Sequence, residues 1–221
     1  MHDRQTSVST LTVSAVSVDQ THAGGGFNPP EPTLAGGPDY GRFVESVRTL
    51  GDLARGVDAP DDVITQAAAL IEQVNALLTP YDADEWHSPS GRRVDLPNRG
   101  GVLNVPSDLK VTGDDRIEGP IRFRRFHLGR NGAAHGGAVG LLFDSLLGFT
   151  AFSLSGSRFQ RTAYLHVNYR QITPIEKDLW ATATLDRVDG RKIYVSGAIL
   201  DGDTVLADAE ALFVKLKPGQ P

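Results

Sequence analysis

HGGAVGLLFDSLLGF, residues 135–149, is the stretch of this 221-residue chain that decides its fold. From Gly136 to Phe152 the sequence is apolar nearly all round, which predicts a helix that is buried on most sides. Its one ionisable group is Asp144. Burying a carboxylate is costly unless it is paired or functional. We therefore interpret Asp144 as a buried acid with a chemical role.

Two glycines, Gly136 and Gly137, form the predicted start of this helix, directly after His135. A helix start leaves backbone N–H groups unpaired and carries the positive end of the helix dipole. Amide donors near a carboxylate suit acyl chemistry, in which the donors stabilise an oxyanion and the acid acts on water. A membrane span is disfavoured, because it needs about 20 apolar residues without a central charge. A core helix with an incidental, satisfied Asp144 remains an alternative.

The composition excludes several classes of protein. Hydrophobic residues make up 40% and charged residues 22%, as in soluble globular proteins. The absence of cysteine excludes disulfides, Cys-based zinc sites and thiol nucleophiles. The net charge of -5 argues against nucleic acid or an anionic membrane as the main partner. No histidine pair has metal-ligand spacing, so no metal is expected. The first twenty residues lack a signal peptide, and we expect a cytoplasmic protein.

Three segments are predicted along the chain. Residues 1–38 are rich in Gly and Pro and are expected to be a flexible tail. Residues 39–85 form a helical extension, with one helix over 40–54 capped by Asp39 and another over 58–79 capped by Asp58. Their apolar stripes are expected to pack on the catalytic domain or across subunits, and an independent interaction module is the alternative. The remaining residues, 86–221, form the catalytic domain.

Alternating apolar and polar residues predict strands on both sides of the apolar helix. The expected strands cover 121–128, 162–172, 179–188, 192–201 and 204–216, with weaker candidates at 101–105 and 109–112. The sequence Asp201-Gly202-Asp203 predicts a hairpin between the last two of the main strands. One apolar helix before a run of antiparallel strands implies a sheet wrapped around that helix. The fold class is therefore α+β.

Three short sequences and one acidic residue together resemble the hotdog-fold acyl-CoA thioesterases. They are HGGA at 135–138, Asp144 nine residues after the His, TAYLHVNYR at 162–170 and VDGRK at 188–192. The resemblance is strongest to the phenylacetate-degradation (PaaI) type and its Them-type relatives in animals. It covers about 118–216 and implies a hotdog fold and hydrolysis of an acyl-CoA thioester, as in fatty acid metabolism.

The resemblance also implies roles for individual residues. In that family the acid matching Asp144 either activates water or attacks the thioester itself. The amide matching Gly136 polarises the thioester carbonyl, with Gly137 beside it, and Thr162 helps to hold the water or the acid. His135 is expected to brace the loop, and direct proton transfer by it is the alternative. The residues expected along the substrate are Asn131, Asn168, Arg170, Arg191, Lys192 and Ser196.

One position departs from the family pattern. PaaI-type enzymes carry Asn or Gln six or seven residues before the first glycine, where this chain has Arg130 and Gly129. The nearest amide is Asn131, which we assign to the substrate side of the site.

The expected partner is acyl-CoA, and no cofactor is implied, since coenzyme A is part of the substrate. The resemblance implies a homodimer or a dimer of dimers, with no stable membrane insertion. The exposed edge of the predicted strand 162–172 also favours pairing with a second copy. Two other functions remain open: a non-catalytic acyl-CoA-binding or sensing protein, and a hotdog dehydratase or hydratase.

Overall fold

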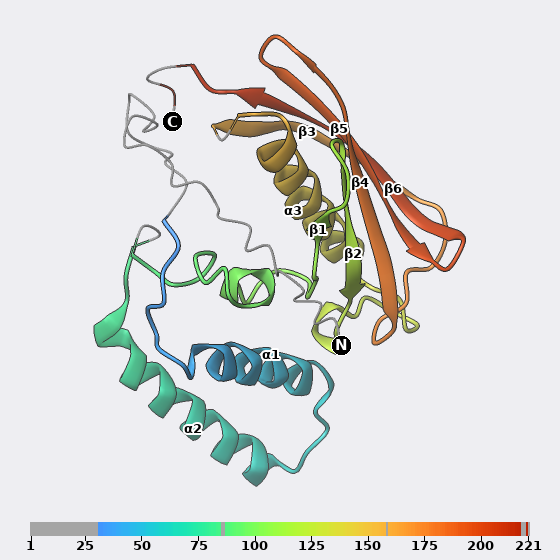
Figure 1. Ribbon diagram of the computed structural model, residues 1–221. Coiled ribbons are helices and arrows are strands. Elements are labelled where there is room, and N and C mark those ends of the chain that lie inside the picture. Colours follow the sequence, from blue (N-terminus) through green and yellow to red (C-terminus); the bar gives the residue numbers. More distant parts are fainter. Residues whose placement is uncertain (1–30, 85–86, 158, 218–219, 221) are drawn as a thin grey trace, which may run out of the picture.

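The computed structural model describes residues 31–84, 87–157, 159–217 and 220. Two helices precede a region of mixed structure, and a long helix then leads into the main strands (Figure 1). The helices are α1 (Tyr40–Gly56), α2 (Asp61–Leu78) and α3 (Gly136–Leu154), and the short 3-10 turns are η1 (Thr79–Tyr81), η2 (Pro97–Gly100) and η3 (Arg125–His127). The strands are β1 (Lys110–Val111), β2 (Arg116–Arg122), β3 (Gln160–Tyr169), β4 (Asp178–Asp189), β5 (Lys192–Asp201) and β6 (Thr204–Lys215).

All six strands join one antiparallel sheet in the order β1-β2-β4-β5-β6-β3. The long helix α3 lies against one face of this sheet, while α1 and α2 lie together away from it (Figure 1). This is the predicted α+β hotdog arrangement, and β3 is an edge strand as expected. The hairpin between β5 and β6 also forms, with Asp201 opposite Thr204.

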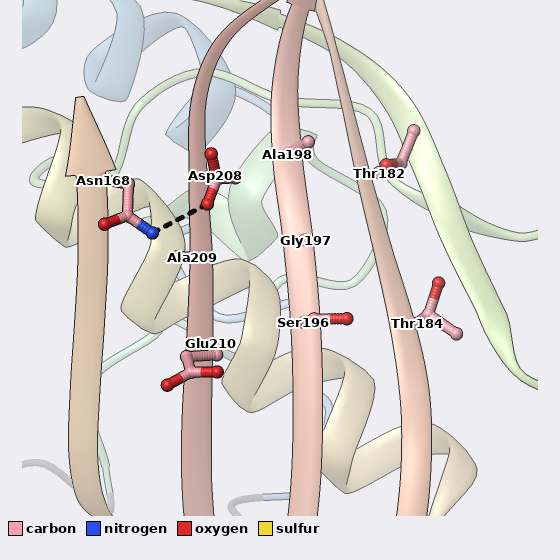
Figure 2. A pocket seen from close by; sticks show the side chains of 9 residues that line it. All are labelled: Asn168, Thr182, Thr184, Ser196, Gly197, Ala198, Asp208, Ala209 and Glu210. Carbon is pink, nitrogen blue, oxygen red and sulfur yellow. Dashed lines mark hydrogen bonds between the residues drawn. The ribbon is translucent and has the colours of Figure 1, made fainter. Parts of the chain in front are cut away.

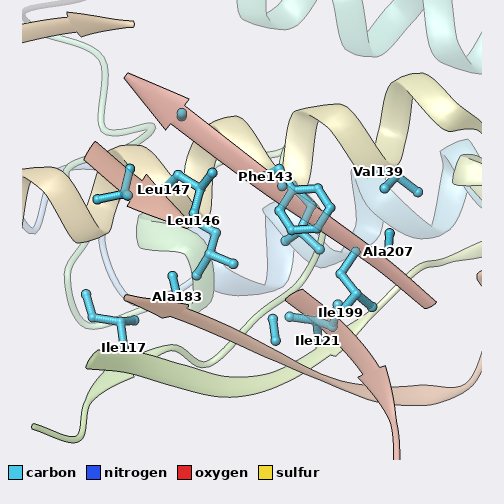
Figure 3. Packing of buried hydrophobic residues seen from close by; sticks show 14 of the residues in the cluster. Ile117, Ile121, Val139, Phe143, Leu146, Leu147, Ala183, Ile199 and Ala207 are labelled. Carbon is cyan, nitrogen blue, oxygen red and sulfur yellow. The ribbon is translucent and has the colours of Figure 1, made fainter. Parts of the chain in front are cut away.

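The core forms where α3 packs on the sheet (Figure 3). Phe143, Leu146 and Leu147 of α3 are fully buried, and burying each such side chain contributes about 1.5–3 kcal/mol. The sheet side of this contact is rich in small residues, which let the helix approach the strands closely. These are Ala181, Ala183, Ala207, Ala209 and Ala211. Within the described residues α3 alone has the length and composition of a membrane span, and its packing makes it the core helix.

The exposure of Asp144 corrects the sequence prediction of a buried acid. Its side chain is exposed on α3, while Phe143 beside it is buried. The physical reason is that the sheet covers a single face of α3. In one chain the opposite face, which carries Asp144, stays open. The near-uniform apolar character of α3 therefore does not mean that every side of it is buried.

Several predicted boundaries move. The cap of α2 is Pro60 rather than Asp58, and the helix begins at Asp61. The strand expected at 121–128 is β2, which ends at Arg122 and is followed by the turn η3. Residues 101–105 form no strand. The two strand errors lie next to Gly and Pro residues, which interrupt the alternation that identifies strands.

The last part of the predicted tail is held in place. Arg93 is buried, and its Nη1 donates to the carbonyl oxygens of Ala35 and Gly37. Arg92 donates to the Glu31 carbonyl, and Thr33 donates back to the Arg92 carbonyl. Residues 31–38 are therefore anchored, which corrects the expectation of a flexible segment there. Residues 1–30 lie outside the described residues.

The two N-terminal helices differ in how they are packed. α1 is joined to the region before α3 by Arg124, which binds Asp52 and Glu45 of α1 at 2.6 and 2.5 Å. Val44 is the buried residue of α1. α2 has no buried residue, and Leu70 and Leu77 are 62% and 68% exposed. Within one chain the apolar stripe of α2 is thus not covered by the hotdog domain.

We predict that Gly197→Ala destabilises the fold. A Cβ at this position of β5 would lie 2.6 Å from the Thr182 carbonyl oxygen and 3.0 Å from Cδ2 of Leu147. Relieving that overlap requires the sheet or α3 to shift, at a cost of about 1–3 kcal/mol. Urea unfolding measures the change. Gly113→Ala is the control, because the nearest atoms to a Cβ there are 3.8 Å away. Equal stability of the two variants would contradict the prediction.

Candidate active site

The start of α3 is held by His135. Its Nδ1 accepts the N–H of Gly137 at 2.9 Å, and its carbonyl accepts from Ala138 and Val139. The His135 N–H in turn donates to the His127 carbonyl at 2.7 Å. Among the described residues, the N–H of Gly136 has no acceptor. The helix start therefore offers a free donor at Gly136, whereas the N–H of Gly137 is taken by the His135 side chain.

Tyr169, at the end of β3, contacts Gly136. Its hydroxyl donates to the Gly136 carbonyl at 2.9 Å. A Cβ at Gly136 would lie 3.3 Å from the Tyr169 hydroxyl oxygen. The space beside the free N–H is thus narrow, and glycine keeps it open. Sequence reasoning gave Tyr169 no role, although its hydroxyl at the end of an otherwise apolar strand face was the available signal.

Asp144 and Thr162 form the second part of the site. Thr162 Oγ1 lies 3.2 Å from Asp144 Oδ1 and donates to it. Both side chains are exposed in the single chain. The pairing agrees with the proposed role of Thr162 in holding the acid, and no other side chain in the described part of the chain bonds to this carboxylate.

A β-bulge in β3 is what turns Thr162 toward α3. Strict alternation would place it with Tyr164 and His166 on the polar face, as the sequence suggested. The register shifts between Thr162 and Tyr164, so Thr162 pairs with the buried Phe213 and Tyr164 pairs with Leu212. The bulge leaves one extra residue in β3 and reverses the alternation. Thr162 therefore lies on the helix side of the sheet.

The free amide and the acid are far apart along α3. Gly136 and Asp144 are eight residues apart, which corresponds to about 12 Å along the helix axis. The structure therefore brings Gly136 together with Tyr169, and Asp144 together with Thr162, as two separate pairs.

The predicted substrate-binding residues fall in other places. Asn168 and Ser196 line a groove of about 370 Å³ on the face of the sheet opposite α3 (Figure 2). Asn168 donates to Asp208 at 2.8 Å, and Arg170 binds the same carboxylate at 2.5 Å. The hydrogen bond from Arg170, followed by that from Asn168, holds the pKa of Asp208 below its usual value.

The remaining predicted residues lie at turns. Arg191 lies in the β4–β5 turn, where its Nε donates to the Lys215 carbonyl, and Lys192 beside it is exposed. Asn131 is exposed and has a left-handed backbone with φ of 51°. The structure does not gather these residues around Asp144, and their roles stay predictions.

A cavity of about 860 Å³ borders the face of α3 that carries Ser145. Phe149 and Phe152 of α3 line it. Its other wall comes from residues 94–109. Ser145 Oγ donates to Asn104 Oδ1 across the cavity at 3.5 Å. Ser145, which lines the cavity, directly follows Asp144 in the sequence. The cavity is large enough to hold an apolar chain.

The helix, the strands and the site residues lie in a segment similar to the thioesterase superfamily, whose family model matches residues 131–207. That range runs from the loop before α3 into β6 and includes both pairs of site residues. It covers about a third of the chain.

Particular relatives narrow this class. The chain is 35% identical over 95 residues to the acyl-coenzyme A thioesterase THEM4 of Rattus norvegicus, covering 42% of this chain and 40% of that protein. It is 28% identical over 91 residues to the human acyl-coenzyme A thioesterase THEM5, covering 40% and 36%. The matches thus span about 40% of the length of these curated relatives.

A solved structure extends the likeness beyond the hotdog domain. The crystal structure of protein RHA08564, a thioesterase superfamily protein, superposes with a TM-score of 0.69 at 24% identity. It covers 85% of this chain and 94% of the other. Residues 86–221 alone could not supply that share, so part of the N-terminal region is included in the common fold.

We predict that His127 makes the protein less stable in acid. Burial lowers the pKa of His127, and its Nδ1 accepts the Arg124 N–H at 2.9 Å. Because the folded pKa lies below the unfolded value of about 6.5, the unfolded chain binds more protons as the pH falls through that value. The stability supplied by neutral His127 is therefore present above that pH and lost below it.

The variant His127→Asn keeps an acceptor near the Nδ1 position and cannot be protonated. Urea unfolding at about pH 8 and about pH 5 is the measurement. The wild type should lose more stability between the two values than the variant. Equal losses would show that His127 titrates alike in the folded and unfolded chains.

Proposed function

We propose that this protein hydrolyses acyl-CoA thioesters to a free carboxylic acid and coenzyme A. The observation that carries the proposal is the Asp144–Thr162 pair on the open face of α3, combined with the unpaired N–H of Gly136 at the start of that helix. The curated relatives that the chain matches are named acyl-coenzyme A thioesterases.

The geometry supports a separate chemical role for the Gly136 N–H and for Asp144. The Gly136 N–H and the positive end of α3 stabilise the negative charge that develops on the thioester oxygen. Asp144, held by Thr162, takes a proton from the attacking water, and the carbon–sulfur bond then breaks. The proton returns to the leaving thiolate, which gives the acid and free coenzyme A. Direct attack by Asp144 on the carbonyl is the alternative first step.

We further propose that each site is shared between two copies of the chain. Gly136 and Asp144 are about 12 Å apart along one helix, whereas both must reach the same thioester group. A two-fold partner that packs its α3 in the opposite direction brings Asp144 of one copy toward Gly136 of the other. The edge position of β3 and the exposure of Asp144 and Thr162 support such an interface.

Asp144→Asn should leave the fold intact and reduce hydrolysis by about 10²–10⁴-fold, because an amide neither accepts the proton nor attacks. Release of free coenzyme A from octanoyl-CoA, followed with a thiol-reactive dye, is the measurement. Asp203→Asn, in the exposed β5–β6 hairpin, is the matched control and should keep full turnover. Near-normal turnover by Asp144→Asn would refute the mechanism. Binding of octanoyl-CoA without release by the wild type would indicate a sensor.

A mixing experiment tests the shared site. Asp144→Asn and Gly136→Val should each be inactive alone, the second because its side chain blocks the donor. Unfolded and refolded together in equal amounts, they should recover about a quarter of the wild-type activity, since half of the dimers are mixed and each has one intact site. Two copies of one variant refolded together serve as the control. Native circular dichroism of each variant with no recovery in the mixture would place each site within one chain.

A further inference from the structure

A second cavity, of about 330 Å³, lies between α1 and the segment that leads into α3. Its walls are mostly apolar, with a few polar side chains among them. The residues that line it are Val47, Arg48, Leu50, Gly51, Ala54, Ile71, Val102, Asn104, Pro106, Arg124, Phe126 and His127. It shares only Asn104 with the larger cavity beside α3. It is therefore distinct from the site described above.

Arg48 in this cavity is buried without a full set of partners. Its side chain is 9% exposed, and its Nη2 donates to the Gly101 carbonyl. Among the described residues its Nε has no hydrogen-bond partner. An unsatisfied buried donor on a charged group is costly, so an acceptor that reached this nitrogen would be stabilising.

The charge of Arg48 also lacks a carboxylate of its own. The nearest acid is Glu45, at 3.9 Å from Nη1, and that side chain is 56% exposed. Glu45 binds Arg124 more closely, at 2.5 Å, and Asp52 also binds Arg124. Both acids in this cluster are thus engaged by one arginine. The second arginine is left facing an apolar cavity.

His127 adds a second donor to the same cavity. Its Nδ1 accepts the Arg124 backbone N–H, so in the neutral ring the hydrogen is on Nε2. Within the described residues no acceptor for Nε2 is present. An apolar cavity with an unpaired guanidinium nitrogen and an imidazole N–H suits a ligand with an apolar body and an anionic, acceptor-only head.

We propose that this cavity binds a free amphiphilic carboxylic acid of medium chain length, with its carboxylate on Arg48 and its chain against Leu50, Ala54 and Phe126. The ligand would lie directly behind the catalytic turn, because the His127 carbonyl holds the N–H of His135. The proposal concerns binding alone, so it does not depend on whether the protein hydrolyses thioesters.

The experiment measures binding of octanoate to the full chain by isothermal titration calorimetry, with octanol as the neutral analogue. Arg48→Met removes the charge while keeping the length of the side chain, and Ala54→Phe fills the cavity from α1. The matched controls are Arg42→Met and Leu53→Phe on the same helix, because both of those side chains are largely exposed and neither lines the cavity.

Octanoate should bind Arg48→Met and Ala54→Phe at least about tenfold more weakly than it binds the wild type and both controls. Octanol should bind the wild type about tenfold more weakly than octanoate does. Ala54→Phe changes an exposed position, so it remains informative if Arg48→Met fails to fold. Unchanged affinity in Ala54→Phe would place octanoate elsewhere, such as the cavity beside α3, and would overturn the proposal. So would the absence of octanoate binding to the wild type, whatever the outcome of the hydrolysis assay.

Discussion

The contact between α3 and the antiparallel sheet is the interaction on which the rest of the structure depends. The helix buries Phe143, Leu146 and Leu147 against an inner sheet face that includes five buried alanines. Because the alanines on the strands are small, the large side chains of α3 determine how the helix packs on the sheet. This packing fixes the rotation of α3 about its axis. That rotation decides which residues of α3 remain outside the core. Asp144 is exposed because the side chains that face the sheet, such as Phe143, point away from it.

The chemistry of the site follows from two local irregularities built onto this regular packing. The bulge in β3 turns Thr162 to the helix side, where it meets Asp144. At the start of α3, the His135 side chain takes the Gly137 N–H and leaves the Gly136 N–H free. Neither feature contributes much to the core. The bulge positions the Thr162 hydroxyl beside Asp144, and the His135 contact leaves the Gly136 N–H available at the start of α3.

Much of this arrangement could be predicted from the sequence, because it depends on periodic patterns. The predicted helix 136–152 corresponds to α3, and the predicted strands 192–201 and 204–216 correspond to β5 and β6 almost residue for residue. The hairpin signal at 201–203 fixed the register of the last two strands. Gly136, Asp144 and Thr162 could also be predicted, because they occur in short sequences that resemble a known family.

The remaining features could not be predicted, because they depend on three-dimensional context. A bulge leaves no mark in an alternating strand, so strict alternation alone places Thr162 on the wrong face of the sheet. The exposure of Asp144 depends on which side of α3 the sheet covers, and composition alone does not reveal this. The cluster around Arg48 and Arg124 joins residues from distant parts of the chain. No local pattern links them.

The lack of any buried residue in α2 has a consequence for the motions of the chain. Most of the stability of a helix in a protein comes from tertiary packing of its apolar face, and within one chain the 18-residue helix α2 gains little from such packing. It can therefore open locally without disturbing the sheet. Its backbone amides should exchange hydrogen through a low-energy opening, whereas those of α3 exchange only when the whole core unfolds. In a single chain, α2 is a separate cooperative unit.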